Sequence, residues 1–236
     1  KKFEKFYGEW WDLKGPFSIL HLFNYIRIDF IEQKLKENNT FFSEKKMDKL
    51  TFLDIGCGGG ILCESLAKRG LDATGVDTSY NAIQIAKKHA KSEGLKINYQ
   101  QSDLLEFKTD LKYDLVTCME VLEHIDNIEI LLEKIKKVLK PSGLFVGSTI
   151  NKTIISFFGA IIVAEKFLNL LPSGTHDWKK FVEISKLKKL LVRSNFHSTE
   201  FQGIKYNPFL KQWSYSNIKS INYLFCAQPR FLDSKI

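Results

Sequence analysis

The residues with the clearest chemical meaning form a glycine-rich turn after a short hydrophobic stretch. Residues 52–60 read FLDIGCGGG, and an acidic residue, Asp77, ends the next hydrophobic stretch in TGVDTS. Glycine lets the backbone adopt positive φ angles and come close to a ligand. A carboxylate at the end of the following strand suits the hydroxyl groups of a ribose. Together the two features predict a nucleoside-binding turn.

The spacing of the glycines separates two kinds of cofactor. The dinucleotide fingerprint requires a third glycine five positions after the first, and counting from Gly56 that position is Ile61. An NAD-dependent dehydrogenase is therefore disfavoured. The crowded glycines, two residues after Asp54, instead resemble the turn of class I methyltransferases, whose cofactor S-adenosylmethionine has no pyrophosphate.

That resemblance implies a set of cofactor contacts. Gly56 would lie against the cofactor, Asp77 would bind its ribose hydroxyls and Asp103 would face the adenine edge. Asp54 and Gly58 belong to the same cofactor-binding turn. Two structural alternatives stay open: the glycines could form a tight turn without a ligand, and Asp103 could cap a helix.

A second group of reactive side chains occupies residues 117–125, which read TCMEVLEHI. If a helical turn begins within this segment, Glu120, Glu123 and His124 share one face of it at i, i+3 and i+4. Two carboxylates and an imidazole at the end of a parallel strand predict a site for Mg²⁺ or Mn²⁺, and the imidazole also tolerates zinc. The alternative is a pair of acids favoured by a helix N-terminus, beside a capping or core histidine.

Methyl transfer to oxygen gives this group a use. The reaction is an in-line displacement that needs an ionised or partly ionised hydroxyl, whereas an isolated phenol has a pKa of about 10. A bound dication lowers that pKa, and a nearby histidine can accept the proton. We therefore expect Glu120, Glu123 and His124 to be catalytic residues as well as metal ligands.

The elements that must position these residues alternate along the chain. Apolar spacing predicts helical structure over residues 1–38, followed by a polar connector over 38–49. Strands and helices then alternate, which predicts a parallel sheet covered on both faces. The predicted strands are 51–55, 72–76, 96–100, 113–118, 143–149, 198–204 and 220–227, and the predicted helices are 59–69, 79–92, 127–139 and 183–193.

These elements describe a single α/β domain over residues 1–236, of the Rossmann-like class I methyltransferase type. We expect a mostly parallel, seven-stranded sheet with an antiparallel edge strand, helices on both faces and an N-terminal helical extension. The domain divides into N-terminal helices and connector (1–50), a cofactor-binding core (51–150), an apolar helical insertion (151–181) and a C-terminal helix with strands (182–236).

Composition excludes some partners. The formal charge is +8, but all except four of the 35 basic residues are lysines, whereas proteins that read nucleic acid rely on arginine. We therefore expect no nucleic-acid partner. The four cysteines lack C-x-x-C spacing, which favours reduced thiols in a cytoplasmic protein and argues against a zinc site.

The insertion over residues 151–181 is unusually apolar. Its segment IISFFGAIIV, residues 154–163, is too short to span a bilayer, which needs about 20 residues. The insertion is expected to form a lid over the core or substrate, or to lie in a membrane surface with lysines at anionic headgroups. His176 and Asp177 within it could form a second catalytic pair or a hydrogen-bonded hinge.

Over nearly its whole length the sequence resembles the ubiquinone-biosynthesis O-methyltransferases. The segments that carry the resemblance are WWDLKGPFSILHLFNYIRIDFI (10–31), FLDIGCGGGILCESLAKRG (52–70), TGVDTSYNAIQIAKKHA (74–90), YDLVTCMEVLEHI (113–125), LKPSG (139–143), STIN (148–151) and LPSGTHDWKKFV (171–182).

The resemblance implies further roles. Arg27 would meet the carboxylate of S-adenosylmethionine, and Met119 would back the cofactor. Glu120, Glu123 and His124 match the family's magnesium ligands. The products would be S-adenosylhomocysteine and a methylated polyprenyl catechol or ubiquinol, formed from a 2-polyprenyl-6-hydroxyphenol or 3-demethylubiquinol.

The implied setting is the surface of a membrane. Residues 151–181 would contact anionic lipids, and other enzymes of ubiquinone synthesis are expected partners. The location would be cytoplasmic, peripheral on the inner membrane in a bacterium, or on the matrix side in a mitochondrion. Two other functions stay open: a methyltransferase for another small phenol or RNA, and a non-catalytic cofactor-binding membrane adaptor.

Overall fold

The computed structural model describes residues 9–15, 17–38, 50–151, 181–207, 209–219 and 222–230. Several sequence-based expectations lie outside these residues. They are the helical structure before residue 9, nearly all of the connector, the insertion from 152 to 180 with His176 and Asp177, and the last six residues.

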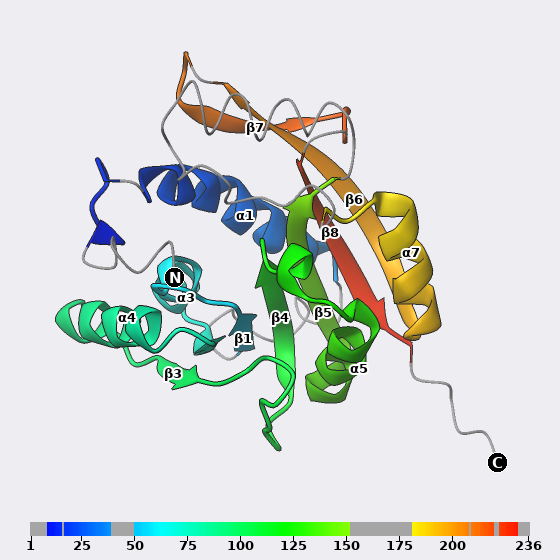
Figure 1. Ribbon diagram of the computed structural model, residues 1–236, viewed down its shortest axis with the longest axis horizontal. Coiled ribbons are helices and arrows are strands. Elements are labelled where there is room, and N and C mark those ends of the chain that lie inside the picture. The colour runs from blue at the N-terminus through cyan, green and yellow to red at the C-terminus, as the bar shows by residue number, and fades with distance from the viewer. Residues whose placement is uncertain are drawn as a thin grey trace.

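A single eight-stranded sheet forms the centre of the molecule (Figure 1). Its strand order is β3-β2-β1-β4-β5-β8-β6-β7. The neighbours from β3 to β5 pair in parallel, β8 runs antiparallel to both β5 and β6, and β7 runs antiparallel to β6. The strands span Thr51–Ile55 (β1), Asp72–Asp77 (β2), Asn98–Gln101 (β3), Tyr113–Met119 (β4), Leu139–Ile150 (β5), Phe196–Asn207 (β6), Gln212–Ser216 (β7) and Asn222–Pro229 (β8).

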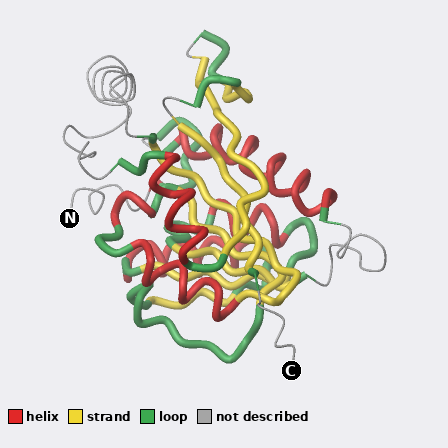
Figure 2. The backbone as a smooth tube through the Cα atoms, turned by 90° about the vertical axis from the view of Figure 1, so that its right-hand side faces the viewer, coloured by secondary structure: helices red, strands yellow, loops and turns green. Residues whose placement is uncertain are grey.

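Helices cover both faces of this sheet, and the strands form a layer between them (Figure 2). The described helices are α1 (Ser18–Glu37), α3 (Ile61–Ala67), α4 (Tyr80–Ser92), α5 (Ile128–Val138) and α7 (Ile184–Arg193), with a short 3₁₀ turn, η3 (Leu122–His124). Among the described residues, no helix is both long and apolar enough to cross a membrane.

Alternating side chains along the strands build two hydrophobic cores. In β1, Phe52 belongs to the core that α1, α3 and α4 cover, and Leu53 belongs to the core that α5 and α7 cover. Leu115 and Val116 repeat this division in β4. Because successive side chains of a strand point to opposite faces, continuous apolar strands fill both cores.

The predicted fold is confirmed, with one strand more than expected. The additional strand is β7, which forms a hairpin with β6 and packs against α1. Trp213 stacks on Phe23 with ring centroids 4.4 Å apart, and the Tyr215 hydroxyl donates to Asp29 Oδ2 at 2.7 Å. The segment QWSYS has too few apolar residues to reveal a strand, and its pairing with β6 and contacts with α1 form only in the folded chain.

Candidate active site

The expected cofactor residues meet at the carboxyl edge of the parallel strands. β1 lies between β2 and β4, and the register aligns Ile55 with Val76 and with Cys118. The turn after β1 therefore lies beside Asp77 at the end of β2 and Met119 at the end of β4. Ligands of doubly wound sheets bind at this edge.

The turn after β1 requires glycine. Gly56 and Gly58 have φ angles of +75° and +53°, in the left-handed region that other residues rarely adopt. A Cβ atom on Gly56 would lie 2.3 Å from Cγ2 of Val121, in the segment after β4. The Gly56 N–H also donates to Val76 O at 2.7 Å, so the turn is held tightly in this position.

Asp77 braces the same turn with both carboxylate oxygens. Oδ2 accepts the N–H of Gly58 at 2.9 Å, and Oδ1 accepts the N–H of Ser79 at 2.8 Å. Each carboxylate oxygen can accept a second hydrogen bond. Asp77 can therefore hold the turn and still accept hydrogen bonds from a ligand.

Asp54 supports the site from inside the core. Its Oδ1 accepts the Thr117 hydroxyl at 2.6 Å, and its Oδ2 accepts the Cys63 thiol at 3.6 Å. Burial raises the pKa of Asp54 to about 6, although the hydrogen bond from Thr117 opposes that rise. The carboxylate thus bridges side chains of β4 and α3 beneath the turn that follows it in the sequence.

Arg27 of α1 is a buried cation close to several carboxylates. Its guanidinium lies over the Phe23 ring, 4.0 Å from the centroid. Burial lowers the pKa of Arg27, whereas the carboxylates of Glu120, Asp54 and Glu123, in decreasing order, raise it. Their negative charge is therefore what stabilises the buried guanidinium.

Two buried charged atoms at this edge lack a hydrogen-bond partner within the part of the chain that the structure describes. They are Arg27 Nε and Glu120 Oε1. Leaving a buried charged group unsatisfied is costly, so such groups are rare outside functional sites. A ligand with charged groups of both signs would satisfy them.

Glu120, Glu123 and His124 do not share the face of one helix, so that prediction is wrong. Glu120 has a φ angle of +56°, and its N–H donates to Ser148 O at 3.0 Å beside β5. Only the next residues form the 3₁₀ turn η3. In this geometry Glu123 is buried and His124 is exposed. No three Cys, His, Asp or Glu side chains among the described residues gather closely enough to hold a metal ion.

Glu123 is nevertheless an unusual carboxyl group. Its Oε2 accepts the Thr149 hydroxyl at 2.7 Å. Burial, and then the negative charge of Glu120, raise the pKa of Glu123 to about 8. Glu123 also lines a cavity of about 520 Å³ between η3, the start of α5 and the segment around Val182 that leads into α7.

The other two predicted cofactor residues differ in their surroundings. Met119 is 7 % exposed and shares its core with Cys57 of the glycine turn. Asp103 is exposed, and its Oδ1 accepts the N–H of Leu105 at 2.8 Å. It therefore caps a local turn after β3.

Two tryptophans next to the glycine turn were not predicted as site residues. A Cβ atom on Gly58 would lie 2.6 Å from the Trp10 ring, and Trp11 Nε1 donates to Gly59 O at 3.1 Å. Trp11 also stacks on His89 of α4, with ring centroids 3.6 Å apart. The signal in the sequence was the rare Trp-Trp pair, but sequence alone does not show which element it covers.

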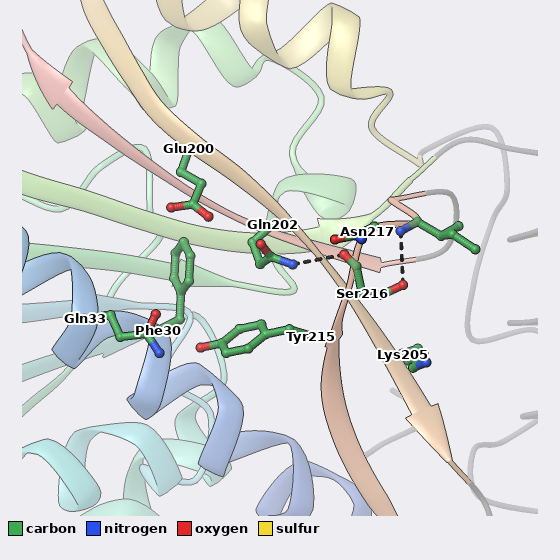
Figure 3. A pocket seen from close by; sticks show the side chains of 9 residues that line it. Phe30, Gln33, Glu200, Gln202, Lys205, Tyr215, Ser216 and Asn217 are labelled. Carbon is green, nitrogen blue, oxygen red and sulfur yellow. Dashed lines mark hydrogen bonds between the residues drawn. The ribbon is translucent and has the colours of Figure 1, made fainter.

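A second cavity, of about 500 Å³, lies away from these residues, between α1 and the strands β6 and β7. Figure 3 shows Phe30 and Gln33 of α1 facing Tyr215 across it, with Glu200 beyond. It contains none of the predicted site residues.

Known proteins are similar to this chain over nearly its whole length. A model of the methyltransferase domain family matches residues 25–200. A ubiquinone biosynthesis O-methyltransferase of Rickettsia prowazekii is 38% identical over 230 residues, which cover 98% of this chain and 89% of the relative. Its counterpart in Pelagibacter ubique is also 38% identical, over 95% of this chain and 94% of the relative. The chain belongs to the ubiquinone biosynthesis O-methyltransferase family. It is an S-adenosylmethionine-dependent O-methyltransferase.

Solved structures agree on the fold of this methyltransferase. Magnesium protoporphyrin IX methyltransferase from Synechocystis, crystallised with bound SAH, has a TM-score of 0.67 at 19% identity, over 97% of this chain and 94% of that chain. An S-adenosylmethionine-dependent methyltransferase from Clostridium acetobutylicum has a TM-score of 0.63 at 17% identity, over 97% and 98% of the two chains. The predicted family, fold and enzyme class are thus confirmed, and the roles of single residues stay predictions.

Proposed function

We propose that this methyltransferase transfers the methyl group of S-adenosylmethionine to a hydroxyl of a polyprenylated catechol or demethylubiquinol in ubiquinone synthesis. The observation that carries the proposal is the similarity to relatives of that name, which extends over 98% of the chain. The geometry of the carboxyl edge supports it, because a nucleoside-binding turn lies beside two unsatisfied charges of opposite sign.

We propose that the cofactor lies across the glycine turn. Gly56 and Gly58 would allow its close approach, and Asp77 would accept the ribose hydroxyls while bracing the turn. Arg27 would donate from its unpartnered Nε to the cofactor carboxylate, which removes the cost of burying that group without a partner. Met119 would contact the cofactor from the end of β4, and Asp103 would face the adenine.

The methyl transfer itself needs little covalent chemistry from the protein. An oxygen lone pair of the acceptor attacks the methyl carbon, the carbon–sulfur bond breaks, and its electron pair stays on sulfur to give S-adenosylhomocysteine. The acceptor proton must leave. We propose that Glu120, Glu123 and His124 bind the acceptor hydroxyl, and that His124 accepts its proton. Alignment of donor and acceptor supplies much of the remaining acceleration.

Glu120, Glu123 and His124 are the residues that would hold Mg²⁺. Glu120 offers an unpartnered buried oxygen, but Glu123 uses an oxygen for Thr149, and His124 is exposed. The described side chains do not form a ready metal site, so we assign no step of the reaction to the ion. If a metal acts, these three residues would have to rearrange to hold it.

A product assay tests the activity and the metal separately. The protein is incubated with S-adenosylmethionine and a short-chain prenyl catechol, with Mg²⁺ or with a chelator. If no methylated product forms under either condition, the proposed activity is contradicted. If equal amounts form under both, the activity stands and only the role of Mg²⁺ is excluded.

Glu120→Gln then tests the role of the cluster. We expect turnover to fall at least about 100-fold while S-adenosylmethionine affinity is retained, because the side chain would act on the acceptor. Glu106→Gln, at an exposed position after β3, is the matched control. Equal losses of affinity and turnover would show that Glu120 only supports the fold of the site.

We also propose a peripheral position on a membrane, because a polyprenylated substrate partitions into lipid. The insertion over residues 151–181 would contact anionic lipids there, near other enzymes of ubiquinone synthesis. Co-sedimentation of the protein with the membrane fraction of its source cells, and its release by high salt, would support this position. Recovery entirely in the soluble fraction at low salt would contradict it.

A further inference from the structure

The hairpin of β6 and β7 projects beyond the rest of the sheet. Among the described residues, β6 pairs with β8 as far as Ile204, and its last residues pair with β7, up to Asn207. The hairpin extends past the other strands in both views (Figures 1 and 2). Its turn therefore lies away from the body of the domain.

The tip of this hairpin carries exposed apolar side chains. Phe209 is 95% exposed and Leu210 is 70% exposed. The Asn207 Oδ1 atom accepts the N–H groups of both residues, at 3.0 and 3.1 Å. The turn is thus hydrogen-bonded in a conformation that presents two large apolar side chains to solvent.

The surroundings of the tip are positively charged. Lys205, Lys211 and Lys219 are exposed, and the chain contains no Asp or Glu from residue 201 to residue 230. Of the acids in contact with the hairpin, Asp29 of α1 accepts the Tyr215 hydroxyl, and Glu200, at the base of the hairpin, pairs with Lys34. An apolar tip within a basic surface is complementary to an anionic lipid surface.

Aromatic side chains lie just behind the tip. Tyr206 and Trp213 are directly opposite each other on the two strands, with ring centroids 5.3 Å apart. Trp213 also stacks on Phe23, which fixes the hairpin to α1. Tyr and Trp favour the boundary between lipid and water because one end of each ring is apolar and the other is polar. The tip is therefore apolar with an adjoining lysine, Lys211, and the aromatic pair lies directly behind it.

The direction of β6 places the tip at the same edge of the sheet as the candidate active site. β5 and β6 both run antiparallel to β8, so β6 is parallel to β5 and ends at the same edge of the sheet. That edge carries the glycine turn and Glu120. A surface that binds the tip would face the candidate active site.

We propose that the hairpin tip, formed by Phe209, Leu210 and Lys211, docks on an anionic lipid bilayer. The two apolar side chains enter the boundary between headgroups and acyl chains, and Lys205 and Lys211 contact the headgroups. The proposal deepens the proposed function and rests on it for its purpose, which is to hold the carboxyl edge toward a lipid-borne acceptor. The binding itself requires only the residues of the hairpin.

Vesicle sedimentation tests this contact in the full chain. The double variant Phe209→Ser/Leu210→Ser is compared with the unaltered protein on phosphatidylglycerol–phosphatidylcholine vesicles and on phosphatidylcholine alone. Leu111→Ser is the matched control, because Leu111 is 60% exposed but precedes β4, at the opposite edge of the sheet. We expect the double variant to lose roughly tenfold or more of its partitioning onto anionic vesicles, since two apolar side chains no longer leave water. The control should bind as the unaltered protein does, and high salt should weaken binding.

Three outcomes would overturn the proposal. The double variant could bind anionic vesicles as well as the control, the unaltered protein could bind neutral vesicles equally well, or it could form a dimer without lipid that the double variant dissociates. The last outcome would assign the tip to a protein interface. Methylation of a water-soluble catechol is measured in parallel and should be unchanged in the double variant. If no form methylates it, the proposed function fails while the vesicle result still stands.

Discussion

Buried charges without partners distinguish the candidate site at the scale of single residues. Arg27 and Glu120 each keep a buried atom without a hydrogen-bond partner among the described residues, although Coulomb attraction between them favours both charges. A core designed only for stability would pair or remove them. Their arrangement is therefore best explained by a charged ligand that is bound during function.

Arg27→Met tests this interpretation of the guanidinium. The substitution keeps an unbranched side chain but removes the donor that we assign to the cofactor carboxylate. The dissociation constant for S-adenosylmethionine should rise about 10- to 100-fold, since a hydrogen bond to a charged group contributes about 1.5–3 kcal/mol. Isothermal titration calorimetry measures the change. Arg69→Met, which removes an exposed arginine bonded to Glu32 at 2.7 Å, should leave affinity unchanged. Equal affinities in both variants would exclude Arg27 from the cofactor site.

Asp54 gives a pH-dependent prediction with a definite sign. Burial raises the pKa of Asp54 from 3.8 to about 6. Between these values the folded protein keeps a proton that the unfolded chain has released, so this residue lowers stability as pH rises from about 4 to 6. Asp54→Asn cannot ionise. Its free energy of unfolding, relative to the unaltered protein, should therefore increase by about 2 kcal/mol across this window. Urea unfolding at several pH values measures the difference, and a constant difference would contradict the assigned pKa.

At the scale of elements, three separate segments hold the glycine turn. The end of β2 holds it through Asp77, the segment after β4 touches it through Val121, and the N-terminal segment covers it through Trp10 and Trp11. These segments lie far apart in the sequence. The shape of the turn is therefore set by the packed domain rather than by its glycines alone.

Trp11→Phe tests the contribution of the N-terminal segment. Phenylalanine can still stack on His89 but cannot donate to Gly59 O, so unfolding should require about 0.5–1.5 kcal/mol less free energy. S-adenosylmethionine should bind more weakly because the turn is held less firmly. Trp213→Phe is the control, since Trp213 Nε1 makes no hydrogen bond within the described chain. If both variants lose the same stability and keep full affinity, the Trp11 hydrogen bond does not support the turn.

At the scale of the whole molecule, the parallel part of the sheet, which carries the candidate active site, meets the antiparallel part, which carries the hairpin. The two parts pack closely where β5 pairs with β8. A Cβ atom on Gly147 of β5 would lie 2.4 Å from the Phe225 ring of β8 and 3.1 Å from Cys118 O of β4. The glycine is thus required where β8 packs against the central strands. This contact fixes where β6, and with it the hairpin, begins.

Gly147→Ala should therefore destabilise the entire domain. We expect a loss of about 1–3 kcal/mol in the free energy of unfolding, typical of an overpacked core. Gly94→Ala is the control: Gly94 has a φ angle of +69° but nothing lies within 4 Å of the added Cβ atom. The control carries only backbone strain, of about 1–2 kcal/mol. Thermal and urea unfolding measure the stability of both variants. If Gly147→Ala loses less free energy of unfolding than Gly94→Ala, this account of the packing is contradicted.

Prediction from sequence succeeded where local patterns are decisive. Strands β1, β2 and β4 follow from short apolar runs that end at polar or glycine residues, and the glycine turn follows from its composition. It failed at Glu120, whose φ angle is positive although the residue is not glycine. The Glu120 N–H donates a hydrogen bond to Ser148 O in β5, a strand that lies far along the sequence, and no local pattern predicts that contact. It also missed β7, whose pairing depends on contacts with α1.

The sequence by itself determined the chemistry that is available: the turn, Asp77, the carboxylate–histidine group and the family. These depend on residue types and short spacings, which do not change on folding. Only the tertiary structure decided which groups meet. Arg27 comes near Glu120 because α1 packs across the carboxyl edge, and Phe209 projects from that edge because β6 runs parallel to β5. Such contacts join residues that are distant along the chain, and they arise only when the two hydrophobic cores are packed.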